Sequence, residues 1–136
     1  MLLFRIARLA HTYARMEQTD RAVQMLSDAL AQLERTGERF SAAEMLRLKG
    51  EVLLMCRGVA KDEAEHCFRT ALEIARAQQA QWWELCSSVS LARLLRDTNR
   101  RDEARAMLSD IYGWFTEGFE LPDLKDARAL LDELSA

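Results

Sequence analysis

The sequence has little of what interrupts helices. Its 136 residues include one proline and five glycines, while alanine, leucine, glutamate, arginine and glutamine are abundant. Because proline and glycine disfavour helix interiors and the abundant residues favour them, the composition predicts an all-α fold and gives a β-sheet little support. A chain of this length is expected to form one compact domain, residues 1–136.

Cysteines and long apolar runs are also scarce. The three cysteines, Cys56, Cys67 and Cys86, are odd in number and widely spaced, which argues against a disulfide framework and fits a reducing compartment. Arg5 and Arg8 interrupt the apolar start of the chain, so no signal peptide is expected. No stretch approaches the roughly 18 apolar residues of a transmembrane helix. The sequence therefore predicts a cytoplasmic protein without a membrane partner.

Motifs for catalysis and for nucleic-acid binding are missing as well. The net charge is −3 and the basic residues are dispersed among carboxylates, so nucleic acid is not an expected partner. Neither G-x-x-x-x-G-K-[ST] nor G-x-G-x-x-G occurs. His66 and Cys67 are adjacent, but neighbours on a helix point about 100° apart and no second ligand follows one turn on. We expect no enzyme, no metal and no cofactor, and a structural role for Cys67.

What the sequence does contain is a repeat. Three segments align without gaps: T-D-R-A-V-Q-M-L-S-D-A-L, K-D-E-A-E-H-C-F-R-T-A-L and R-D-E-A-R-A-M-L-S-D-I-Y. Their shared alanine recurs after 42 and then 40 residues, with apolar residues four and seven positions further on. Such offsets define one face of a helix. The three sets are Ala22, Leu26 and Ala29; Ala64, Phe68 and Ala71; and Ala104, Leu108 and Ile111.

A second amphipathic helix is expected before each of these faces. It carries a small residue, at Ala10, Gly50 and Ala92, which would let the paired helix approach closely. The paired pattern resembles the tetratricopeptide repeat (TPR), in which Leu-Gly, Tyr, Ala, an aromatic residue and a second Ala recur at set positions. The period here exceeds the usual length of about 34 residues, so the helices should be longer than is typical of that family.

The resemblance implies a right-handed superhelix of three antiparallel helix pairs followed by a capping helix. The repeats would cover about 2–36, 41–78 and 81–115, and the cap about 122–135. The helices are expected at about 2–16, 20–36, 42–56, 61–78, 81–97, 101–115 and 122–134.

Several local signals set these limits. Gly37 stops the second helix, and Pro122 suits the first turn of the last one. Ser41 with Glu44 forms a capping-box pattern at the start of the third helix, and Phe40 is placed to staple onto it.

The first helix has apolar residues on several sides, although a terminal helix of a repeat array should have a polar outer face. Two explanations stay open: the chain was cut from a longer solenoid, or this face pairs with another copy. Both predict self-association of the isolated chain through this helix.

A longer resemblance covers roughly residues 30–134. Segments such as E-A-E-H-C-F-R-T-A-L-E-I-A-R-A-Q and Y-G-W-F-T-E-G-F are similar to the C-terminal TPR region of large bacterial regulatory proteins. In those proteins a cyclase-type or DNA-binding domain precedes a predicted ATPase and a helical tail. The resemblance implies a sensory or interaction tail, and it brings no catalytic motif to this chain.

The TPR resemblance also predicts which residues line the inner groove. Charged or polar candidates are His11, Arg15, Glu44, Arg47, Glu51, Arg93 and Arg96. The arginines could converge on an acidic peptide or a carboxylate, because guanidinium offers a planar fork of donors. Alternatively, they pair internally with the carboxylates of the same face. Similarly, Trp82, Trp83 and Trp114 could contact a partner or form a packing cluster that anchors the cap.

Taken together, these features predict a non-enzymatic protein-interaction or regulatory module, with a protein or peptide as its partner. The alternative is a helical-repeat domain that senses a small molecule and regulates an attached cyclase, ATPase or transcription-factor domain.

Overall fold

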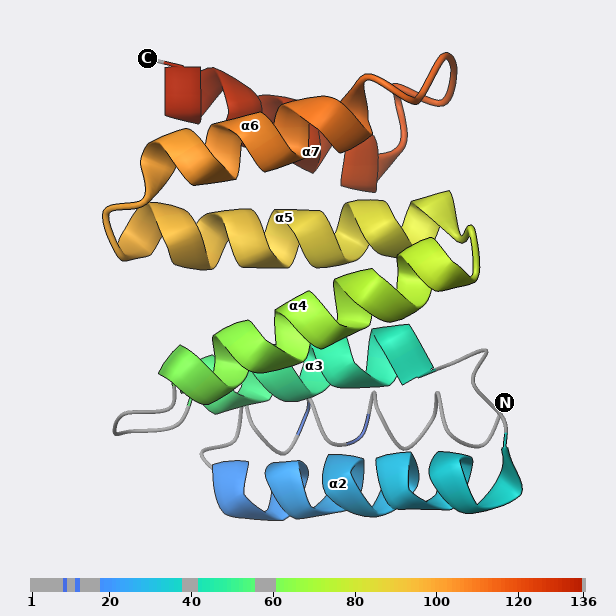
Figure 1. Ribbon diagram of the computed structural model, residues 1–136. Coiled ribbons are helices and arrows are strands. Elements are labelled where there is room, and N and C mark those ends of the chain that lie inside the picture. Colours follow the sequence, from blue (N-terminus) through green and yellow to red (C-terminus); the bar gives the residue numbers. More distant parts are fainter. Residues whose placement is uncertain (1–8, 10–11, 13–17, 38–41, 56–60, 136) are drawn as a thin grey trace.

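The computed structural model describes residues 9, 12, 18–37, 42–55 and 61–135, and within these ranges the protein is entirely helical (Figure 1). The helices there are α2 (Thr19–Thr36), α3 (Ala42–Met55), α4 (Lys61–Ala77), α5 (Gln81–Asp97), α6 (Arg101–Tyr112) and α7 (Pro122–Ser135). The all-α prediction is confirmed. The predicted first helix, its small residue Ala10 and the capping signals at Phe40 and Ser41 lie outside the described residues.

The predicted helix limits agree with the structure to within one residue, except at the end of α6. The sequence predicted a helix to Phe115, but α6 ends at Tyr112. The Trp114 and Phe115 amides donate to the carbonyls of Ile111 and Tyr112, both at 3.2 Å. These bonds span three residues, so the helix tightens into a turn instead of continuing.

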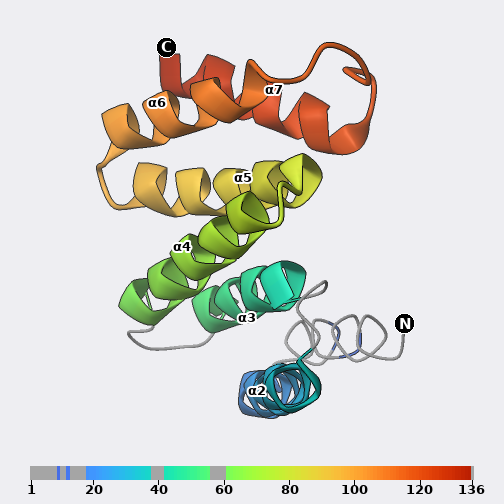
Figure 2. The same ribbon diagram turned by 45° about the vertical axis from the view of Figure 1, so that its right-hand side comes forward.

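The helices follow one another as a stack, with α2 at one end and α6 with α7 at the other (Figures 1 and 2). Each helix from α2 to α7 packs against the next one in the chain. In addition, α3 contacts α5 and α5 contacts α7. The contacts between alternate helices thus join α3, α5 and α7 in a row on one side of the stack, and we call this row the inner wall.

The repeated alanines lie where consecutive helices meet. Ala22, Ala64 and Ala104 are all fully buried, as the repeat predicted. Phe68 is the largest fully buried side chain among the residues that the structure describes. It covers Gly50, where an added Cβ would lie only 2.5 Å from the ring. The expected role of Gly50, which is close approach of the paired helix, is therefore confirmed.

The last described helix, α7, packs onto the end of the stack. It buries Leu124, Ala127, Leu130 and Leu134 and packs against both α5 and α6. These residues join the same hydrophobic core as the apolar faces of α4, α5 and α6. Since α5 contacts both α3 and α7, the helix α7 continues the row of helices that forms the inner wall.

Candidate functional site

The inner wall contains a small cavity at the junction of its three helices. Its volume is about 80 Å³, and it is lined by Arg47 from α3, by Cys86, Val89, Ser90 and Arg93 from α5, and by Asp123 and Asp126 from α7. The four positions on α5 are spaced at three and four residues, which places them on one face of that helix. This cavity brings charged and polar side chains from separate parts of the sequence together.

Arg47 is held by groups of the protein itself. Its guanidinium donates two hydrogen bonds to the Glu44 carboxylate, one of them from Nε at 2.9 Å. Nη1 donates to Ser90 Oγ at 3.3 Å, and Ser90 Oγ donates to Glu51 at 2.7 Å. Burial opposes the charged form of Arg47, but the bond to Glu44 and the charges of Glu44 and Glu51 outweigh it and raise the pKa of Arg47. The network therefore fixes α3 against α5.

Arg93 and Asp126 differ from Arg47 in that both are exposed at the cavity. Neither forms a hydrogen bond or an ion pair with any residue that the structure describes. Asp123 accepts only a weak hydrogen bond there, from Cys86 Sγ at 3.9 Å. The cavity thus presents one guanidinium and two carboxylates whose hydrogen-bonding capacity is largely unused.

The groove residues predicted from the sequence fall into four groups. His11 and Arg15 lie outside the described residues. Glu44, Arg47 and Glu51 come together in the internal network, and Arg93 lines the cavity.

Arg96 is directed elsewhere. It donates to Asp97 at 3.0 Å and to Glu133 at 2.8 Å. Arg47 and Arg96 therefore both pair with carboxylates of the protein itself, which is the alternative that the sequence left open.

The three aromatic candidates differ in their surroundings. Trp82 packs edge-on against Phe115, with ring centroids 5.9 Å apart and an interplanar angle of 81°. Trp83 is half-buried, whereas Trp114 is 52% exposed. Trp82 therefore anchors the segment after α6 through Phe115, while Trp114 stays accessible.

Sequence reasoning missed Ser90, Asp123 and Asp126. The two aspartates lie next to Leu124 and Ala127, which start the apolar stripe of α7. A residue beside a buried stripe lies at the edge of the contact between its helix and a neighbour. That signal could have placed the two aspartates at a helix edge, but not beside α5, which is not the preceding helix. Ser90 offered no such signal, because only the fold brings it beside Arg47.

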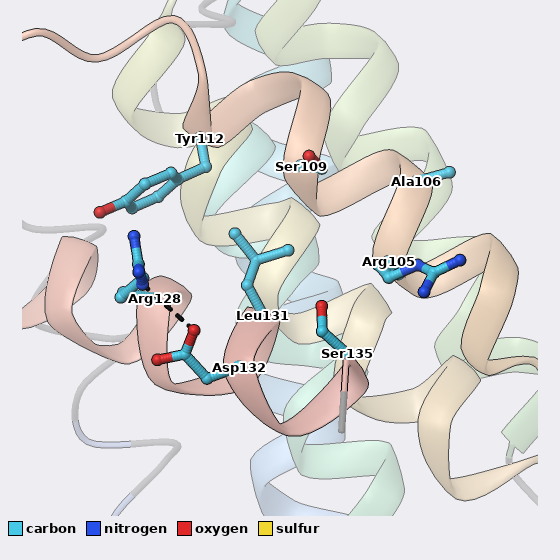
Figure 3. A pocket seen from close by; sticks show the side chains of 8 residues that line it. All are labelled: Arg105, Ala106, Ser109, Tyr112, Arg128, Leu131, Asp132 and Ser135. Atoms are coloured by element: carbon cyan, nitrogen blue, oxygen red, sulfur yellow. Dashed lines mark hydrogen bonds and ion pairs between the residues drawn. The ribbon is translucent and has the colours of Figure 1, made fainter.

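A larger cavity of about 410 Å³ lies between α6 and α7 (Figure 3). Its cations are Arg105 from α6 and Arg128 from α7, and Tyr112 also lines it (Figure 3). Arg128 also donates to Asp132 at 3.2 Å, and Arg105 lies 3.9 Å from Asp102. Carboxylates thus offset both positive charges, which makes this cavity a weaker candidate than the inner wall.

Among the residues that the structure describes, no group of three or more His, Cys, Asp or Glu side chains is arranged to hold a metal ion. In the same part of the chain, no helix is both long and apolar enough to cross a membrane.

Comparison of the sequence with protein-family models and with curated proteins finds no match. The functional interpretation therefore depends on the repeat pattern and on the geometry of the inner wall.

Cys86 offers a test of how closed this cavity is. Burial, followed by the nearby charge of Asp123, raises the pKa of Cys86 to about 12. Only the thiolate reacts with iodoacetamide, so at pH 8 we expect alkylation of Cys86 to be on the order of 10³-fold slower than in the urea-unfolded chain, where the pKa is about 8.5. Mass spectrometry of the tryptic peptide 77–93, which contains no other cysteine, measures this rate.

The pH dependence provides the control. In the folded protein the rate should keep rising about tenfold per pH unit above pH 9, where an ordinary thiol levels off. Asp123→Asn should speed the reaction, because it removes a charge that opposes the thiolate. Equal rates in folded and unfolded protein would mean that Cys86 is open to solvent.

Proposed function

We propose that this chain is a TPR-like helical-repeat module that binds a segment of a partner protein on its inner wall. In this proposal it is not an enzyme, it forms a right-handed superhelix, and it serves as the C-terminal regulatory tail of a larger cytoplasmic bacterial signalling protein. The observation that carries the proposal is the contact of α3 with α5 and of α5 with α7. This alternation is what paired helical repeats produce, and it leaves one continuous surface for a partner.

The chemistry of the cavity supports a polypeptide as the ligand. Arg93 offers donors to a carboxylate, while Asp123 and Asp126 offer acceptors to an ammonium or a guanidinium. A peptide supplies both charges within a few residues. Arg47 contributes less than the sequence suggested, because Glu44 and Glu51 already neutralise it.

The size of the cavity favours a peptide over a small molecule at this surface. Pockets for small ligands commonly enclose about 300–1,000 Å³, whereas this one has about 80 Å³. A cavity of that size accepts the end of one side chain. The rest of the ligand would lie along the wall, as an extended or helical segment does.

The test is a phage-displayed library of 12-residue peptides selected on the wild-type chain and counter-selected on Arg93→Glu/Asp126→Arg. We expect surviving clones, and synthetic peptides from them should bind the Arg93→Glu variant at least about tenfold more weakly by fluorescence anisotropy, a loss of about 1.4 kcal/mol. Arg128→Glu, on the other side of α7 and away from the inner-wall cavity, is the matched control and should bind as the wild type does. Both variants should melt within a few degrees of the wild type.

Two results would overturn the proposal. One is a library without clones that survive the counter-selection. The other is equal weakening by Arg93→Glu and Arg128→Glu, which would show a general charge effect instead of a site.

A further inference from the structure

The segment between α6 and α7 exposes three large apolar side chains. Trp114 is 52% exposed, Phe119 43% and Leu121 44%. They lie within eight residues of one another, and Figures 1 and 2 show this loop projecting beyond the stacked helices. We call these three residues the loop patch. Burial of such side chains by a partner is favourable, by about 25 cal/mol per Å² of apolar surface.

The loop is held in shape by the helices beneath it. The Phe119 ring packs on Tyr112, with centroids 5.7 Å apart, and Phe115 packs on Trp82 from α5. The Leu121 amide donates to the Gly118 carbonyl at 2.9 Å, which closes the turn before α7. The apolar side chains are thus presented on an ordered backbone, and a partner would not have to order the loop on binding.

The charged residues of the loop itself all have one sign. Between Arg105 and Lys125 the sequence contains Asp110, Glu117, Glu120 and Asp123 and no lysine or arginine. Glu117 and Glu120 are exposed and belong to the same loop as the patch. Within the loop the apolar side chains are therefore flanked by two exposed carboxylates, and the nearest basic residues, Lys125 and Arg128, belong to α7.

Exposed apolar side chains next to negative charge favour some binding partners of the loop patch over others. A second copy would bring an equally acidic loop, and the two like charges would repel. A membrane surface carries anionic lipids and would be repelled for the same reason. A segment with apolar side chains flanked by lysine or arginine satisfies both features of the patch.

We propose that the loop patch docks a basic amphipathic segment of a partner protein. This is a second interaction surface, separate from the inner wall. It rests on the proposed role as an interaction module, but not on Arg93 or the cavity. The apolar residues of the segment contact Trp114, Phe119 and Leu121, while its basic residues face Glu117 and Glu120.

The probe is a fluorescein-labelled 16-residue amphipathic helix with leucine and tryptophan on one face and lysine on the other, and its twin has glutamate in place of lysine. We expect the basic peptide to bind the full chain at least tenfold more tightly than the acidic one, and binding should weaken as salt rises from 50 to 200 mM. Trp114→Ala/Phe119→Ala should reduce the affinity at least tenfold. Glu117→Lys/Glu120→Lys should reverse the preference between the peptides.

The matched control is Leu54→Ala/Met55→Ala, which removes two side chains of similar exposure, 37% and 39%, at the end of α3. It should bind the basic peptide as the wild type does. Arg93→Glu should also leave this binding unchanged, so failure here and failure at the inner wall can be told apart. Circular dichroism confirms that each variant is folded.

Three outcomes would overturn the assignment. The first is equal affinity for the two peptides, and the second is equal loss in the loop and α3 variants. The third is a wild-type chain that dimerises in sedimentation and becomes monomeric in Trp114→Ala/Phe119→Ala, which would make a second copy the occupant.

Discussion

Phe68→Ala should lower the free energy of unfolding by about 3–5 kcal/mol, the usual cost of deleting a buried phenylalanine ring. Phe68 is fully buried and lies over Gly50 of α3, with α4 and α3 closely packed around it. Removing the ring loses its transfer free energy and leaves a cavity that two packed helices can fill only in part. A domain of this size has a total stability of about 5–15 kcal/mol, so much of it depends on this one side chain.

Urea unfolding followed by circular dichroism measures the effect as a fall in the midpoint at a nearly constant slope. Phe119→Ala is the matched control, because it deletes the same ring from a position that is 43% exposed. Its cost should be about 1 kcal/mol or less. Similar losses in the two variants would contradict the assignment of Phe68 to the centre of the core.

The repeat was enough to place the part of the core that α2, α4 and α6 contribute. Ala22, Ala64 and Ala104 lie in equivalent positions of three aligned segments, and all three are fully buried. A helix at the surface of a protein typically buries one apolar stripe, so the shared positions were expected to be that stripe. The extent of each periodic pattern predicted the limits of most helices. Gly37 and Pro122 added local signals, because glycine favours the position after a helix end and proline the first turn of a helix.

The end of α6 was harder to predict. Tyr112, Gly113, Trp114 and Phe115 continue an apolar pattern that a helix could use. Phe115 instead turns to pack on Trp82 from the start of α5. That contact joins residues 33 positions apart in the sequence, and a local pattern carries no information about it.

Sequence-based prediction met the same limit at the charged residues of the inner wall, where contacts between helices decide which side chains are paired. The sequence placed Glu44, Arg47 and Glu51 on one helical face, since they are three and four residues apart. It could not show that Ser90 joins them from α5, or that Arg47 is consequently engaged and Arg93 is not. Whether a charged side chain is available to a partner depends on what the neighbouring helix brings to it, and that is a property of tertiary packing.

Gly50→Ala should destabilise the protein by about 1–2 kcal/mol, although alanine is the better helix former. The intrinsic preference for alanine over glycine in a helix is about 1 kcal/mol. Against it, the new Cβ would lie 2.5, 2.8 and 2.9 Å from three atoms of the Phe68 ring. Overpacking of this kind costs about 1–3 kcal/mol, and a fully buried ring has no free space to move into. Gly50→Val, with two more carbons, should cost about 3 kcal/mol or more.

Gly113→Ala tests whether the effect of a glycine-to-alanine substitution on stability changes sign where there is room for the methyl group. Gly113 has helical backbone angles, φ −64° and ψ −15°, and a Cβ there would meet nothing closer than 3.4 Å. Alanine at that position should stabilise the protein by about 0.4–1 kcal/mol. The same substitution is thus expected to have opposite effects at two glycines, and thermal unfolding of the two variants compares them directly.

A double-mutant cycle can show that the Phe68 ring causes the destabilisation by Gly50→Ala. Phe68→Leu costs stability by itself, but it withdraws the ring atoms that the new methyl group meets. Gly50→Ala should therefore cost at least about 1 kcal/mol less in the Phe68→Leu background than in the wild type, a coupling well within the range measured for residues in contact. An equal cost in both backgrounds would mean that the methyl group meets something other than Phe68. In that case the close approach of α3 and α4 would not depend on the small residue that the repeat pattern singles out.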